Sequence, residues 1–141
     1  MIKWAKRVSQ KFVNAFRGFY IVLKEEKSLW VHLFTTIVVI IFGVVFNLNL
    51  IEWSLIVFAI GLVIGFELLN TAIEYLVDIV SFEYSVKAKK VKDVAATATL
   101  VATLTAVAIG LLVFIPAIIN FSAGAEPASN AISFMIGNIY V

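Results

Sequence analysis

The sequence contains no cysteine, two prolines, one histidine and few charged residues. Without cysteine it can form neither a disulfide framework nor a cysteine metal site, and the redox compartment stays open. Charged residues make up 14% of the 141 residues and hydrophobic residues 62%, with a mean hydropathy of +1.05. A chain this apolar cannot bury its side chains in one small soluble core. The composition therefore predicts a membrane protein of one domain.

Familiar nucleotide-binding motifs are also missing. The sequence has no Gly-x-x-x-x-Gly-Lys-[Ser/Thr] loop and no Gly-x-Gly-x-x-Gly stretch. Any nucleotide chemistry must therefore be built from other residues. A cleaved signal peptide is not expected, because a long charged segment precedes the first apolar run and no small-residue cleavage site follows it.

Three long apolar segments predict an all-α protein with three transmembrane helices. They cover about residues 29–47, 53–80 and 94–119. Each approaches or exceeds the ~20 residues that cross about 30 Å of hydrocarbon, and Pro116 is expected to mark the far end of the third. Ahead of them, apolar residues at helical spacing alternate with basic ones, which predicts an amphipathic surface helix over about residues 2–27. Residues 1–120 form the expected membrane domain, and residues 121–141 form a tail of unknown role.

The basic residues predict how the chain crosses the membrane. All eleven Lys and Arg residues lie before residue 28 or between residues 87 and 92. Three spans with a cytoplasmic amino terminus place both clusters inside, as the positive-inside rule requires. We therefore expect a multi-pass membrane protein with its amino terminus in the cytoplasm. Nucleic acid is not an expected partner, since no soluble basic module surrounds either cluster.

Four polar residues interrupt the second apolar segment: Glu67, Asn70, Glu74 and Asp78. At 100° per residue they fall within an arc of about 80°, so they form one stripe. A charge buried in the bilayer costs about 2.5 to 3.5 kcal/mol, so the stripe must face protein, water or a ligand. It is compatible with an oligomer contact, an ion or proton path, or a catalytic site.

The depth of the stripe and the loop after it favour chemistry at the cytoplasmic face. A span that starts near Trp53 ends at about residue 72, which puts Glu67 roughly 7 Å inside the inner boundary. Glu83, Lys92 and Asp93 bring further charges to the same face, where carboxylates and cations can hold Mg²⁺ together with phosphate. A transporter, the alternative of another class, would more naturally hold its carboxylates near the bilayer midplane.

The stretches "ELLNTAIEYLVD" (67–78) and "KDVAA" (92–96), with "NAFRGF" and "KEEKSLWVH" before them, resemble a known family. It is the bacterial integral-membrane diacylglycerol kinase and undecaprenol kinase family, in its Gram-positive-type branch, and the resemblance covers about residues 4 to 116. It implies a homotrimer with shared active sites. The implied reaction transfers the γ-phosphate of ATP to a lipid hydroxyl with Mg²⁺. The expected lipid is undecaprenol, with diacylglycerol as the alternative.

The resemblance also implies roles for individual residues. Glu67 matches the general base, with Asn70 and Asp78 as supporting polar residues. Glu26 and Glu74 match metal-linked carboxylates at the nucleotide. Other matches surround the nucleotide: Arg7, Asn14, Glu83, Tyr84, Ser85, Lys92 and Asp93. Trp30 stands where the family usually has arginine, and His32 aligns with a histidine of this branch and is expected to be an interface residue and not a catalyst.

Overall fold

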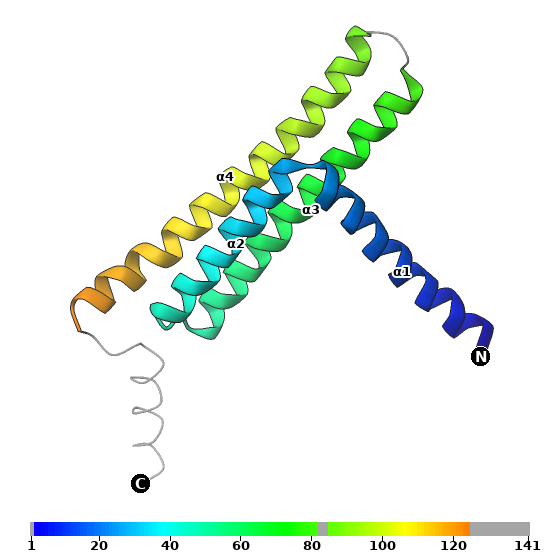
Figure 1. Ribbon diagram of the computed structural model, residues 1–141. Coiled ribbons are helices and arrows are strands. Elements are labelled where there is room, and N and C mark those ends of the chain that lie inside the picture. Colours follow the sequence, from blue (N-terminus) through cyan, green and yellow to red (C-terminus); the bar gives the residue numbers. More distant parts are fainter. Residues whose placement is uncertain (1, 82–84, 125–141) are drawn as a thin grey trace.

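The fold is built from four α-helices. The computed structural model describes residues 2–81 and 85–124, and this part of the chain contains no strand (Figure 1). The helices are α1 (Ile2–Glu25), α2 (Lys27–Val45), α3 (Leu50–Val80) and α4 (Val86–Ser122). The predicted all-α class is confirmed. The tail predicted from residue 121 lies mostly outside the described residues.

Three of the helices, α2, α3 and α4, are long and apolar enough to cross a membrane. Many of their large apolar side chains are exposed in the single chain, among them Phe34, Phe58 and Leu112. Exposed apolar surface on this scale needs lipid or another protein to cover it. The sequence-based expectation of three spans therefore agrees with the helices that form.

Pro116, which is expected to mark the far end of the third span, lies inside α4, and the helix continues beyond it to Ser122. Proline removes one backbone hydrogen bond, and transmembrane helices tolerate that loss where neighbouring groups satisfy the freed carbonyl. α4 also starts earlier than the predicted span, at Val86, and so extends the helix into the basic segment.

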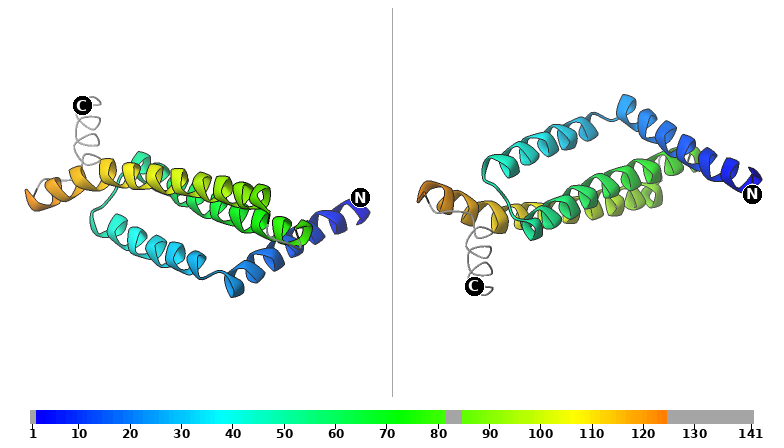
Figure 2. Two further views of the ribbon diagram at one scale, coloured as in Figure 1. Left: turned by 90° about the horizontal axis from the view of Figure 1, so that it is seen from above. Right: turned by 90° about the horizontal axis from the view of Figure 1, so that it is seen from below.

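Helices α3 and α4 run side by side along their length, and α2 lies beside the part of this pair nearer residues 46–49 (Figures 1 and 2). The other part of the pair, toward residues 81–85, extends beyond the start of α2. A buried cluster near residues 46–49 joins the three helices. It consists of Leu48, Ile56, Val113 and Ala117, with further apolar side chains packed against it.

The turn between α2 and α3 is held by two capping arrangements. Asn47 has a φ of 50°, and Leu48 N–H donates to Gly43 C=O at 3.1 Å, the pattern of a Schellman motif. Asn49 then caps α3, and Glu52 completes a capping box. Because Gly43 has no side chain, the Trp53 ring can pack directly against α2.

Helix α1 leaves the other three at a corner near Glu26 (Figure 1). The Trp30 indole nitrogen donates to the Leu23 carbonyl at 2.8 Å and so links the end of α1 to α2. This bond satisfies one of the carbonyls that the last turn of a helix leaves without an intrahelical partner. Every residue from 11 to 20 is exposed, whereas Val22 is buried, so the carboxyl-terminal end of α1 packs on the rest of the chain.

Candidate active site

Glu67 lies on α3 opposite the first turns of α2, and it is 6% exposed. The Ser28 hydroxyl donates a hydrogen bond to Glu67 Oε1. His32 Nε2 lies 3.8 Å from Glu67 Oε2. Ser28 and His32 are four residues apart on a helix and therefore share one face. The Ser28 hydroxyl thus satisfies one oxygen of a carboxylate whose burial would otherwise be costly, and His32 faces the other.

Asn70 and Glu74 form the next part of the stripe. Asn70 Nδ2 donates to Glu74 Oε1 at 2.7 Å. Asn70 Oδ1 is buried and has no hydrogen-bond partner among the described residues. The amide must point its nitrogen at the carboxylate, because an amide oxygen would repel it. Among the described residues, this buried oxygen therefore keeps an unused capacity to accept a hydrogen bond.

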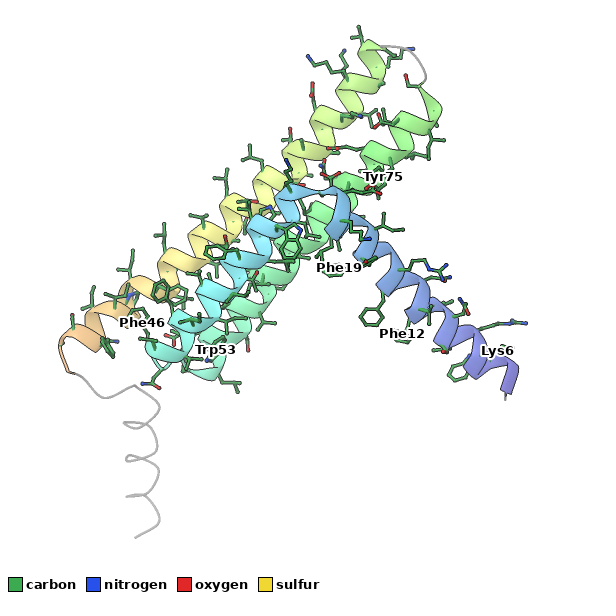
Figure 3. All side chains as sticks on the ribbon, in the orientation of Figure 1. Lys6, Phe12, Phe19, Phe46, Trp53 and Tyr75 are labelled. Carbon is green, nitrogen blue, oxygen red and sulfur yellow. The ribbon has the colours of Figure 1, made fainter. Side chains whose placement is uncertain are left out.

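A group of acidic side chains surrounds Tyr75, which lies beside the α1–α2 corner (Figure 3). The Tyr75 hydroxyl donates to Glu25 Oε2 at 2.6 Å. The charges of Glu25, Glu26 and Glu74 all act on this hydroxyl. Glu26 itself is the N-cap residue of α2, but its side chain makes no capping hydrogen bond. The α1–α2 corner therefore brings the carboxylates of three elements toward one region.

The donor types in this region suit Mg²⁺. Glu26, Glu74 and Asn70 Oδ1 offer oxygen atoms, which Mg²⁺ prefers, and Asn70 Oδ1 has no hydrogen-bond partner in the part of the chain that the structure describes. Within the described part of one chain, no group of three or more Asp, Glu or His side chains is arranged to hold a metal ion. Mg²⁺ sites in proteins usually combine one or two carboxylates with substrate phosphates and water.

Asp78 and Lys92 form a salt bridge between α3 and α4, close to residues 81–85. Both side chains are well exposed, at 63% and 36%. Such a pair adds only about 0–1 kcal/mol to stability. It does hold the ammonium group of Lys92 at the end of the polar stripe.

Other predicted nucleotide residues are not brought to Glu67 in the single chain. Arg7 and Asn14 are exposed on α1, and Asn14 accepts a hydrogen bond from Gln10 at 3.2 Å. Ser85 is the N-cap residue of α4 and makes no side-chain capping bond, and Asp93 is exposed. Glu83 and Tyr84 lie outside the described residues.

Reasoning from the sequence missed Ser28, Glu25 and Tyr75 as parts of this region. A signal existed for Ser28, because it precedes His32 by four residues at the start of an apolar helix and so lies on the same face. No comparable signal identifies Glu25, since Glu25 and Glu26 are adjacent and only the angle of the α1–α2 corner decides which one meets Tyr75.

An apolar cavity of about 220 Å³ lies between α2, α3 and α4, next to the Glu67 region. His32 contributes to its wall and also faces Glu67. Beyond His32 the wall is mainly aliphatic, with residues such as Val39, Ile60 and Val107. The buried carboxylate thus lies beside a space suited to a hydrocarbon chain.

Three apolar helices, with a polar site beside a cavity of this kind, define a multi-pass membrane protein with a site suited to a lipid. A sequence model of the family described as "Prokaryotic diacylglycerol kinase" matches residues 13–114. The chain belongs to this family and is a lipid kinase.

Two relatives support the same assignment. An undecaprenol kinase from Bacillus subtilis (strain 168) is 38% identical over 110 residues, which cover 78% of this chain and 89% of the relative. A diacylglycerol kinase from Synechocystis sp. (strain ATCC 27184 / PCC 6803 / Kazusa) is 33% identical over 110 residues, which cover 77% of this chain and 63% of that protein.

Proposed function

We propose that this protein uses ATP and Mg²⁺ to phosphorylate undecaprenol, giving undecaprenyl phosphate. The main support is Glu67, a buried carboxylate that accepts a hydrogen bond from α2 and lies beside an apolar cavity. The choice of polyprenol is supported by the undecaprenol kinase relative, which matches over most of its own length. Diacylglycerol is the second candidate, because the other relative carries that activity in its name.

Glu67 acts in this proposal as the general base for the lipid hydroxyl. Phosphoryl transfer depends mainly on positioning and on stabilising charge, so one base close to the hydroxyl suffices on the lipid side. Ser28 and His32 hold or face the carboxylate, and Asn70 and Glu74 continue the polar stripe away from the cavity. The lipid therefore approaches from the apolar side and the nucleotide from the polar side.

The nucleotide side carries the remaining predicted residues. Glu26, Glu74 and Asn70 Oδ1 would hold Mg²⁺, which when bound neutralises charge on the phosphate oxygens. Lys92 lies close by through its salt bridge to Asp78. Arg7, Asn14, Glu83, Tyr84, Ser85 and Asp93 complete the proposed nucleotide surroundings.

The proposal includes a homotrimer with shared active sites in the cell membrane, with the amino terminus and the site facing the cytoplasm. Arg7 and Asn14 lie on α1, which points away from Glu67 of its own chain, so a neighbouring chain is the natural destination for them (Figure 1). The orientation is supported by the basic residues, which are confined to the two segments expected inside.

The deciding experiment uses the purified full chain in lipid or detergent with labelled ATP and Mg²⁺. Undecaprenol and diacylglycerol are offered separately, and phosphorylated lipid is measured, with Glu67→Gln as the inactive control. We expect faster labelling of undecaprenol. Labelling of diacylglycerol alone would make diacylglycerol the substrate in place of undecaprenol. If a folded oligomer labelled neither lipid, the result would contradict the proposal. ATP-independent ion flux into vesicles would favour the transporter alternative.

A further inference from the structure

The reaction proposed above gives His32 no contact with the substrate. His32 contacts the apolar cavity on one side and faces Glu67 on the other. It is therefore part of both the cavity wall and the carboxylate site. It is also the single histidine of the chain.

The distance between His32 and Glu67 suits a bound hydroxyl. His32 Nε2 and Glu67 Oε2 are 3.8 Å apart, too far for a good direct hydrogen bond. A hydroxyl oxygen can sit at about 2.8 Å from both atoms, which is a normal hydrogen-bond distance. It would accept from His32 Nε2–H and donate to Glu67 Oε2.

The other carboxylate oxygen is already used. The Ser28 hydroxyl donates to Glu67 Oε1. While Oε1 accepts this bond, Oε2 is the oxygen that faces His32. Thr71, one turn further along α3, is also buried, but its hydroxyl bonds to the Glu67 carbonyl, so it does not compete for the carboxylate.

We propose that His32 Nε2 and Glu67 Oε2 together bind the primary hydroxyl of the lipid substrate, and that Ser28 is the positioning residue that orients Glu67. This inference rests on the proposed lipid phosphorylation and deepens it. It also gives His32 a role in place of the interface residue expected from the sequence. Both candidate lipids share a primary alcohol at the polar end of a largely hydrocarbon molecule.

The proposed reaction is a direct transfer of the γ-phosphoryl group of ATP to the lipid hydroxyl. The hydroxyl oxygen forms a bond to the γ-phosphorus of ATP while its proton moves to Glu67 Oε2. The bond from the γ-phosphorus to the bridging oxygen breaks, and ADP leaves with that oxygen. His32 keeps its proton throughout and holds the attacking oxygen in place. Glu67 then returns its proton to water.

A direct test observes the imidazole itself in the absence of ATP. Because the chain has one histidine, protein labelled with ¹⁵N-histidine gives the signals of a single imidazole. The purified full chain in detergent is titrated with farnesol, with dioctanoylglycerol, and with farnesene, which has a similar chain but no hydroxyl. We expect both alcohols to shift the Nε2 resonance saturably and farnesene to shift it far less.

Equal shifts from farnesol and farnesene would overturn the proposal, because the chain alone would then explain them. No shift from either alcohol would overturn it as well. Since no ATP is present, this measurement is independent of turnover. A wild-type protein that shows the shift but phosphorylates no lipid would contradict the proposed function and leave the hydroxyl site standing.

The rate of lipid phosphorylation in His32 variants provides a second test. We expect His32→Leu to lower kcat/KM for the lipid alcohol about tenfold or more, the effect of one lost hydrogen bond, with the KM for ATP unchanged. His32→Gln keeps an N–H donor and should recover part of the loss. Equal activity of His32→Leu and wild type would contradict the proposal.

Ser28 is tested by its own pair of variants. Ser28→Ala should lower kcat about tenfold with little change in either KM, because the carboxylate is no longer oriented, and Ser28→Thr should restore it. Ser54→Ala is the matched control, since the Ser54 hydroxyl donates to the Leu50 carbonyl of its own helix, about 20 Å along α3 from Glu67. A loss in Ser28→Thr as large as in Ser28→Ala would show that Ser28 acts through packing, which is against the proposed role.

Discussion

Glu67 and Glu74 lie on the same helix seven residues apart, about 10 Å along its axis, yet their surroundings differ. Glu67 is buried beside the apolar cavity and receives the Ser28 hydroxyl. Glu74 is half-buried, bonded to Asn70, and close to the acidic group around Tyr75. One carboxylate therefore suits a lipid hydroxyl and the other suits a metal with phosphate.

This difference predicts two separate defects. Glu67→Gln should reduce kcat by at least about 100-fold, the usual contribution of a general base, while Mg·ATP affinity stays near that of the wild type. Glu74→Gln should weaken Mg·ATP binding, because an amide neither carries the charge nor binds Mg²⁺ as strongly. Lipid phosphorylation and titration with a fluorescent ATP analogue measure the two effects. Equal loss of nucleotide affinity in both variants would refute this division.

At the level of single elements, the packing of α2 against α3 depends on Gly43. A Cβ at this position would lie 2.7 Å from Trp53 Cη2 and 2.9 Å from Cζ2. Gly43→Ala should therefore destabilise the fold by about 1–3 kcal/mol, seen as a lower Tm in detergent. Gly18→Ala is the control, because a Cβ there meets nothing within 4 Å. Similar Tm values for the two variants would show that the Trp53 contact is unimportant.

Variants of the salt bridge between α3 and α4 can distinguish a role in stability from a role in nucleotide binding. Because the Asp78–Lys92 pair is exposed, Lys92→Met should change the Tm by no more than a few degrees. If Lys92 faces the nucleotide as proposed, the same variant should raise the KM for ATP about tenfold, while Asp78→Asn has a smaller effect. A large fall in Tm with unchanged KM would assign the pair a purely structural role.

For the whole molecule, the proposed orientation is open to a labelling test. The chain has no native cysteine, so single reporters can be introduced without background. A cysteine at position 49, in the α2–α3 turn, should react with a membrane-impermeant reagent added to intact cells. A cysteine at position 85, at the start of α4, should react only after the membrane is opened. The reverse pattern would overturn the positive-inside argument.

Shared active sites predict that two inactive chains can restore each other. Glu67→Gln and Arg7→Ala are each expected to have low activity as homo-oligomers. If Arg7 from one chain serves Glu67 of a neighbour, mixed oligomers prepared by co-expression should regain a measurable fraction of wild-type activity. The control is each variant unfolded and reassembled on its own, so that only homo-oligomers form. No recovery in mixed oligomers of proven composition would contradict sharing.

Much of this molecule follows from local pattern. Runs of apolar residues of membrane-spanning length predicted α2, α3 and α4, because hydrophobic length is a property of consecutive residues. The helical period alone predicted that Glu67 and Glu74 lie on one face of α3. Local pattern did not show how far α4 continues beyond Pro116, because whether a proline ends or merely interrupts a helix depends on what surrounds it.

By itself, the sequence determined the helices, the polar stripe and the resemblance to membrane lipid kinases. Only the tertiary structure decided that Ser28 and His32 face Glu67, that Glu25 binds Tyr75, and that Lys92 pairs with Asp78. These contacts join different helices. They depend on how each helix is rotated and shifted against its neighbour, and those quantities are set by packing and turn geometry, beyond the period of any single helix.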